Sequence, residues 1–170
     1  MAASITSAES YGRPSLRFVV SHPAHFIAFG FGVGLSPIAP GTFGTLLALP
    51  MYAWLAPRLD NQQFLLLLAA MFIAGAWACD ISGKRLGVHD HGGMVWDEVT
   101  AFLAVLFFTP ATPLWQTCAF LLFRLFDIAK PMPIRHFDRN VRNGLGVMFD
   151  DVLAAFYALL CLAGWKFSFG

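Results

Sequence analysis

The chain alternates long apolar runs with short polar segments, a pattern that predicts several helices. Residues 18–57 contain no Asp, Glu, Lys or Arg, but prolines and glycines interrupt them, so this stretch cannot form one long helix. We predict a membrane-surface piece over residues 18–31 and a Gly/Pro loop over residues 32–44. The following helix is expected to begin at Thr42, whose side chain would act as the N-cap.

A second apolar run, residues 64–79, is unbroken, and a short polar turn with Arg58 and Asp60 precedes it. We therefore expect the first two runs to form a helical hairpin. Both runs are shorter than the roughly 20 residues that cross a bilayer core unaided. Partial insertion and local thinning of the bilayer both stay open at this point.

The third apolar run, residues 99–123, allows two arrangements because a Thr-Pro-Ala-Thr-Pro segment interrupts it. A single span would put Asp97 and Asp127 on opposite membrane faces, whereas two short helices would return the chain to the same face. Lysine and arginine cluster after both the second and the third run, and such clusters prefer the cytoplasmic side. This charge distribution favours two short helices. A final run, residues 152–165, closes the predicted bundle.

The composition favours lipid as the surrounding solvent. Hydrophobic residues make up 58% of the chain and charged residues 12%, whereas soluble domains carry about 25% charged residues. We predict an all-α integral membrane bundle with short membrane helices and an active site on the cytoplasmic face. All five tryptophans lie near the ends of apolar runs, which is typical of an interfacial belt. The formal net charge of +1 argues against a nucleic-acid partner.

Acidic residues gather at the borders of the apolar runs. Carboxylates beside hydrocarbon are costly unless they pair or bind a cation, and hard oxygen ligands suit Mg²⁺. In a simpler interpretation, the acidic pairs only cap and stabilise the first turns of two helices. Two such pairs, with two more acids at the opposite ends of helices, favour a metal site. The six border acids are Asp80, Asp97, Glu98, Asp127, Asp150 and Asp151.

Basic residues follow the third run closely and are candidates for phosphate binding. Asp127 and Lys130 lie three apart, which puts them on one helix face. Either they form an ion pair, or Asp127 faces a metal while Lys130 and neighbouring arginines hold phosphate oxygens. The candidate arginines are Arg124, Arg135 and Arg139, and the positive-inside rule explains the last two equally well.

The Gly/Pro loop offers a second kind of phosphate ligand. Backbone N–H groups at Gly41 and Thr42 would point toward an anion if a helix begins there. The loop lacks the Lys-Ser/Thr ending of a P-loop, so nucleotide binding is not supported. Asp90 lies between His89 and His91 in a short loop, and these histidines are either ligands or simply exposed.

Three strings in the chain resemble the phosphatidylglycerophosphatase A family: GVGLSPIAPGTFGT, DHGGMVWDE and FRLFDIAKPMPI...GVMFDD. The resemblance implies a Mg²⁺-dependent enzyme that hydrolyses phosphatidylglycerophosphate to phosphatidylglycerol, in an all-helical fold at a bacterial inner membrane. We assign residues 31–170 to this family-like domain and residues 1–30 to an N-terminal segment that is polar or lies at the membrane surface. The acids and the lysine that match the family pattern are Asp90, Asp97, Glu98, Asp127, Lys130, Asp150 and Asp151. Asp80 is a candidate by position only.

Catalysis is expected from all of the matching residues except Asp90, which we expect only to bind metal. Two other functions are weighed against this one. A CDP-alcohol-type lipid phosphotransferase also clusters aspartates, but its Asp-Gly-x-x-Ala-Arg string is absent. An ion transporter or channel would carry its acids at mid-helix depth, and internal repeats, neither of which the sequence has. A phospholipid substrate and the membrane are therefore the expected partners, and the oligomeric state stays open.

Overall fold

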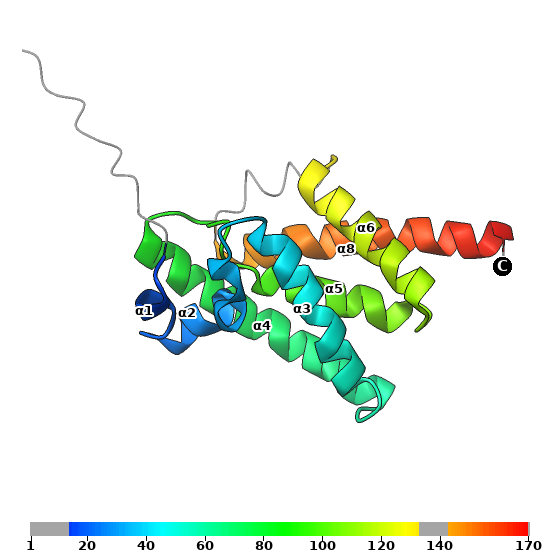
Figure 1. Ribbon diagram of the computed structural model, residues 1–170, viewed down its shortest axis with the longest axis horizontal. Helices are drawn as coiled ribbons and strands as arrows, with labels where there is room; N and C mark the ends of the chain where they lie inside the picture. Colours follow the sequence, from blue (N-terminus) through cyan, green and yellow to red (C-terminus); the bar gives the residue numbers. More distant parts are fainter. Residues whose placement is uncertain (1–13, 133–142, 170) are drawn as a thin grey trace, which may run out of the picture.

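The computed structural model describes residues 14–132 and 143–169, and these residues are entirely helical or irregular (Figure 1). The predicted all-α class is therefore confirmed for the described part of the chain. The helices, with η1 a 3₁₀-helix, are α1 (Leu16–Val19), α2 (Pro23–Ala28), η1 (Gly30–Leu35), α3 (Pro40–Leu55), α4 (Asn61–Leu86), α5 (Trp96–Phe108), α6 (Pro113–Ala129) and α8 (Gly144–Phe169).

Helix α5 is the centre of the fold. It is apolar on nearly every side after its first turn, and a helix with this pattern has to be surrounded by other helices. Helices α3 and α8 pack closely against it, and α4 and α6 add further cover (Figure 1). Phe102, Leu103 and Leu106 are completely buried in the resulting core.

The break in the third apolar run is confirmed as a connection between two helices. Helix α5 ends at Phe108, and α6 begins at Pro113, where a missing N–H group costs nothing. Thr112 is the N-cap of α6 and accepts a hydrogen bond from the Trp115 N–H group. Because α6 runs back along the bundle, its last turn reaches the first turn of α5 (Figure 1).

The start of α3 differs from the prediction. Thr42 is the third residue of the helix and not its N-cap, because the helix begins at Pro40. Ala39 is the N-cap, in a left-handed conformation with φ 45°. Proline is favoured at the first helical position, since its fixed φ suits the helix and it has no N–H to satisfy. The predicted loop over residues 32–44 is consequently helical at both ends.

Helices α3 and α4 are joined by a short turn, as expected of a helical hairpin, but they pack mainly against other helices. Asp60 and Gln63 form a reciprocal capping box at the start of α4. Beyond the turn the two helices diverge, because α3 packs against α5 whereas α4 packs against α2 and α8 (Figure 1). Tyr52 and Phe64, with ring centroids 5.7 Å apart, are in contact near the turn.

The N-terminal helices pack onto α4. Val19 and Phe29 are completely buried there, while Val20 and Phe26 are exposed. His25 and Ser82 share a buried hydrogen bond of 2.8 Å between Nδ1 and Oγ. Burial lowers the pKa of His25, which favours the neutral imidazole in this pair. The division of the chain at residue 30 stays a prediction.

Helix α8 approaches α4 unusually closely, and glycine makes this possible. A Cβ atom on Gly144 would lie 1.9 Å from the Ala76 carbonyl oxygen. One on Gly75 would lie 2.5 Å from Met148 Sδ. Small residues at such crossings let helix backbones come together. The crossing fixes where the second turn of α8 lies relative to α5.

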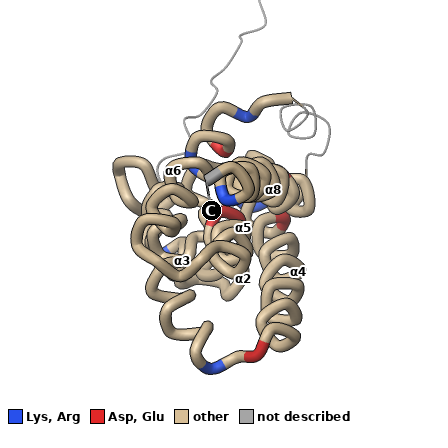
Figure 2. Tube along the Cα trace, turned by 90° about the vertical axis from the view of Figure 1, so that its right-hand side faces the viewer, with Lys and Arg blue, Asp and Glu red and all other residues tan. Residues whose placement is uncertain are grey.

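Two of the described helices, α4 and α8, are long and apolar enough to cross a membrane by length and composition. The sequence of α4 has no charged residue before Asp80, and most of its tube is tan in Figure 2. Trp54 and Trp165 are exposed, as an interfacial belt requires. Trp96 is not part of such a belt, because it is buried and its Nε1 donates to the Met71 carbonyl at 3.1 Å.

Candidate active site

A polar pocket of about 380 Å³ lies where α3, α5 and α8 begin and α6 ends. It is the meeting point of four segments that are far apart in the sequence. Its charged lining residues are Asp90, Asp97, Glu98, Arg124, Asp127, Lys130, Asp150 and Asp151, and Ala39, Pro40 and Gly41 complete one wall. The hypothesis that acids from separate helices meet at one edge of the bundle agrees with this arrangement.

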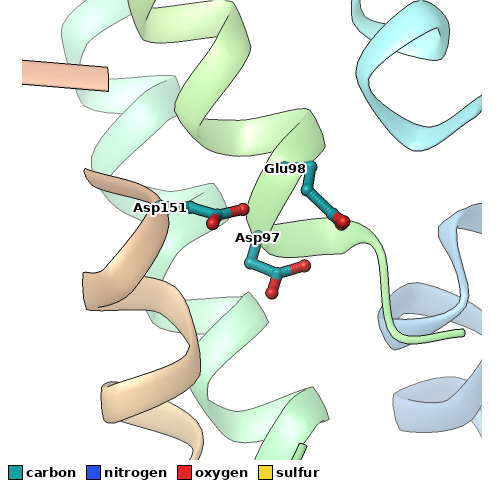
Figure 3. A group of neighbouring side chains, drawn as sticks. All are labelled: Asp97, Glu98 and Asp151. Carbon is teal, nitrogen blue, oxygen red and sulfur yellow. The ribbon is translucent and has the colours of Figure 1, made fainter. Parts of the chain in front are cut away.

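Three of these acids form the tightest group. Asp97 and Glu98 belong to the first turn of α5, and Asp151 reaches toward them from α8 (Figure 3). Each residue offers an oxygen atom, and these atoms all lie within 4.8 Å of one another. Asp97 and Asp151 are buried, with 7% and 4% of their surface exposed. Like charges this close and this buried require compensation.

The oxygen atoms of this group fit a cation. Asp97 Oδ1, Glu98 Oε2 and Asp151 Oδ2 are buried and have no hydrogen-bond partner among the residues that the structure describes. Burial, and then the charge of Glu98, raises the pKa of Asp97 well above the ordinary carboxyl value. Burial and the charge of Asp151 do the same for the pKa of Glu98. A divalent cation with hard oxygen preference would satisfy all three atoms.

Two cations balance the remaining acids. Arg124 Nη1 pairs with Asp127 one turn along α6 and lies 3.7 Å from Glu98 Oε1. Lys130 Nζ lies 3.3 Å from Asp150 Oδ2 on α8. Lys130 ends α6 in a left-handed conformation, with φ 40°, before Pro131. The ion pair within α6 thus involves Arg124, while Lys130 reaches across to α8.

Glycine is required at the start of α3. A Cβ atom on Gly41 would lie 2.1 Å from Glu98 Oε1 and 3.1 Å from Arg124 Nη1. Thr45 is the last residue of the string GVGLSPIAPGTFGT and was not predicted as a site residue. Its hydroxyl donates to the Gly41 carbonyl at 2.9 Å and accepts from Arg124 Nη1 at 3.5 Å. Thr42 does not line the pocket. Helix α3 therefore packs closely against Glu98 and Arg124 through Gly41 and Thr45.

Neither acidic pair caps its helix, although Asp97 and Glu98 do lie in the first turn of α5. Val95 is the N-cap of α5 and makes no side-chain cap bond, so Asp97 is already inside the helix. Helix α8 begins at Gly144, which puts Asp150 and Asp151 in its second turn. Their carboxylates line the pocket instead of serving as caps.

The structure separates Asp80 from the other border acids. Its carboxylate pairs with Lys84 on the same helix at 2.6 Å and lines a different, smaller pocket beside His89. Asp90, in contrast, lines the main pocket. The candidates Arg135 and Arg139 lie outside the described residues.

Comparison with known proteins agrees with this arrangement of residues. The family model described as Phosphatidylglycerophosphatase A matches residues 26–166. The chain belongs to the phosphatidylglycerophosphatase A family. The resemblance found in the sequence is thereby confirmed, and every residue that lines the pocket falls within the matched segment.

Similar proteins match most of the chain. A phosphatidylglycerophosphatase A of Haemophilus influenzae is 43% identical over 148 residues, which are 86% of this chain and 91% of that protein. The Escherichia coli K12 protein of the same name is 43% identical over 139 residues, covering 81% and 80% of the two chains. A Bacteroides thetaiotaomicron protein with the provisional name phosphatidylinositol-3-phosphatase is 37% identical over 151 residues, covering 85% and 94%. No solved structure matches the chain.

Proposed function

We propose that this protein hydrolyses the terminal phosphate monoester of phosphatidylglycerophosphate, giving phosphatidylglycerol and inorganic phosphate, with Mg²⁺ as cofactor. The observation that carries the proposal is the convergence of buried carboxylates from α5 and α8 beside Arg124 and Lys130. The two relatives named phosphatidylglycerophosphatase A support the choice of substrate.

Asp97, Glu98 and Asp151 are the residues that would hold the metal. Each offers an oxygen atom within 4.8 Å of those of the other two, and each has a buried oxygen atom without a hydrogen-bond partner in the described part of the chain. Asp90, Asp127 and Asp150 line the same pocket and offer further carboxylates near the metal ligands. When bound, a divalent cation supplies charge neutralisation at the phosphate oxygens and lowers the pKa of a water molecule.

The side chains around this acidic group bind the phosphate and transfer the proton of the attacking water. Lys130 and Arg124 donate to the phosphate oxygens and stabilise the charge that grows on them. A carboxylate outside the tight group, from Asp127 or Asp150, takes the proton of the attacking water. The water oxygen bonds to phosphorus as the bond from phosphorus to the glycerol oxygen breaks. That glycerol oxygen then takes up a proton and becomes the free hydroxyl of the product.

We further propose a multi-pass protein of the bacterial inner membrane, with the pocket on the cytoplasmic face. Helices α4 and α8 support membrane insertion, and the pocket lies at the ends of helices, where a lipid headgroup is found. The basic residues that follow the second and third apolar runs support the cytoplasmic orientation.

Phosphate release from a defined lipid tests the proposal. Detergent-purified protein is incubated with phosphatidylglycerophosphate and Mg²⁺, and parallel samples contain EDTA or the Asp97→Asn or Asp151→Asn variant. Asp60→Asn, at the distant turn before α4, is the matched control and should retain activity. EDTA and the two site variants should each lower the rate by at least about 100-fold. Absence of phosphate release under every condition would discard the enzyme hypothesis.

A further inference from the structure

A groove with mostly apolar walls lies between α3 and α6, beside the candidate active site, and the proposed chemistry does not use it. Its volume is about 360 Å³. We call it the α3–α6 groove, and its walls are Leu46 and Leu49 of α3 with Pro113, Gln116, Thr117 and Phe120 of α6.

The two walls of the α3–α6 groove lie on helices that also line the active-site pocket, although the two spaces share no lining residue. On α6, Phe120 lies one helical turn before the pocket residue Arg124, and Gln116 lies two turns before it. On α3, Leu49 lies two turns beyond the pocket residue Gly41. With a rise of about 1.5 Å per residue, both walls extend about 12 Å from the pocket. Because α3 leads away from the pocket and α6 leads back to it, the two rows line one path.

Arg124 lies at the boundary between the two spaces. Its Nη1 atom is 3.7 Å from Glu98 Oε1 on the acidic side and 3.5 Å from Thr45 Oγ1 on α3. Charged groups therefore lie on one side of this boundary, and mostly apolar, uncharged side chains on the other. The complement of such a site is an amphiphile with an anionic phosphate head and an alkyl tail.

We propose that the α3–α6 groove holds one acyl chain of the lipid substrate while the phosphate monoester occupies the pocket. This inference rests on the proposed function and adds a determinant of substrate orientation. In a bilayer or micelle, hydrocarbon surrounds the chain whether or not it is bound, so the groove gains little affinity from the hydrophobic effect. Its contribution is to set the depth and direction at which the phosphate enters the pocket.

A second apolar groove, between α6 and α8, is less suited to hold the acyl chain of the substrate. It includes Leu121 and Cys161 and has a volume of about 380 Å³. One turn closer to the pocket, the rings of Phe126 and Tyr157 are in contact, with centroids 5.5 Å apart. The Tyr157 hydroxyl also donates to the Met132 carbonyl at 3.3 Å. These contacts place two aromatic rings between the groove and the carboxylates. Between the α3–α6 groove and the pocket, the contact that joins the two helices is the longer one of 3.5 Å from Arg124 to Thr45.

The test compares substrates that differ only in chain length. Leu49→Trp and Leu46→Trp fill the α3–α6 groove, and Leu121→Trp fills the α6–α8 groove as the matched control. We measure kcat/KM in one detergent for dipalmitoyl and dihexanoyl phosphatidylglycerophosphate, because a hexanoyl chain is too short to occupy the length of the groove. Each α3–α6 variant should lower the dipalmitoyl-to-dihexanoyl ratio about tenfold, and Leu121→Trp should keep the wild-type ratio.

The outcomes separate this inference from the proposed function. If wild-type protein hydrolyses both lipids and the α3–α6 variants retain its ratio, the groove does not hold the acyl chain. A ratio that falls only in Leu121→Trp would also overturn the inference and would favour the other groove. If wild-type protein releases phosphate from neither lipid, the proposed function itself fails. Leu46 is 39% exposed, so Leu46→Trp keeps the test valid if Leu49→Trp does not fold.

Discussion

Gly41→Ala should inactivate the enzyme without unfolding it. The added Cβ would lie 2.1 Å from Glu98 Oε1, whereas ordinary contacts begin at 3.4 Å, so this oxygen has to move by about 1.3 Å. The atom is at the end of a flexible side chain, so it moves aside easily, but it then leaves the acidic group. A displacement of about 1 Å in a catalytic site costs about 100-fold in rate, which is about 2.7 kcal/mol in the activation barrier.

Stability should change little in this variant, since alanine favours a helix over glycine by up to about 1 kcal/mol. Gly164→Ala in α8 is the matched control, because a Cβ there meets no atom within 4 Å. Both variants are assayed by phosphate release and by thermal unfolding in detergent. A folded Gly41→Ala protein with wild-type kcat would refute the argument that α3 is fitted against Glu98.

Three further predictions concern the charges around the pocket. Arg124→Gln leaves two largely buried carboxylates without their cation and should destabilise the protein by about 3 kcal/mol in chemical denaturation. Without metal, the raised pKa values of Asp97 and Glu98 mean that the folded protein binds more protons than the unfolded chain. Stability in EDTA should therefore fall as pH rises above the ordinary carboxyl range, and the gain in Tm on adding Mg²⁺ should grow with pH. Asp80→Asn removes a partner of the well-exposed Lys84 and should change activity and stability by less than about 0.5 kcal/mol.

Local sequence patterns predicted most helices of this fold. The uncharged stretch that became α4 and the proline-containing break between α5 and α6 are signals that act within a few residues. The prolines remove N–H donors and fix φ, so the third apolar run had to divide whatever surrounded it. The start of α3 was misplaced because a proline at the first position outweighed the capping preference of Thr42.

Long-range packing decided what the sequence left open. Asp80 and Asp97 both border an apolar run, and only the path of α4 places Asp80 away from the pocket. Trp96 resembles the exposed tryptophans in sequence, but the crossing of α4 over α5 buries it. Thr45 ends the family-like string GVGLSPIAPGTFGT, but its role was not predicted, because its contact with Arg124 joins residues 79 apart in the chain.

The most direct test of the central claim is the binding of a divalent cation itself, measured without any lipid. Mn²⁺ can be titrated into detergent-purified protein and free ion followed by electron paramagnetic resonance, with Mg²⁺ added as competitor. We predict saturable Mn²⁺ binding, with the bound Mn²⁺ displaced by Mg²⁺. Asp97→Asn and Asp151→Asn should each weaken the affinity at least about tenfold, whereas Asp80→Asn should leave the affinity unchanged. Equal affinity in wild-type protein and in both pocket variants would contradict the claim that acids of α5 and α8 hold the ion together.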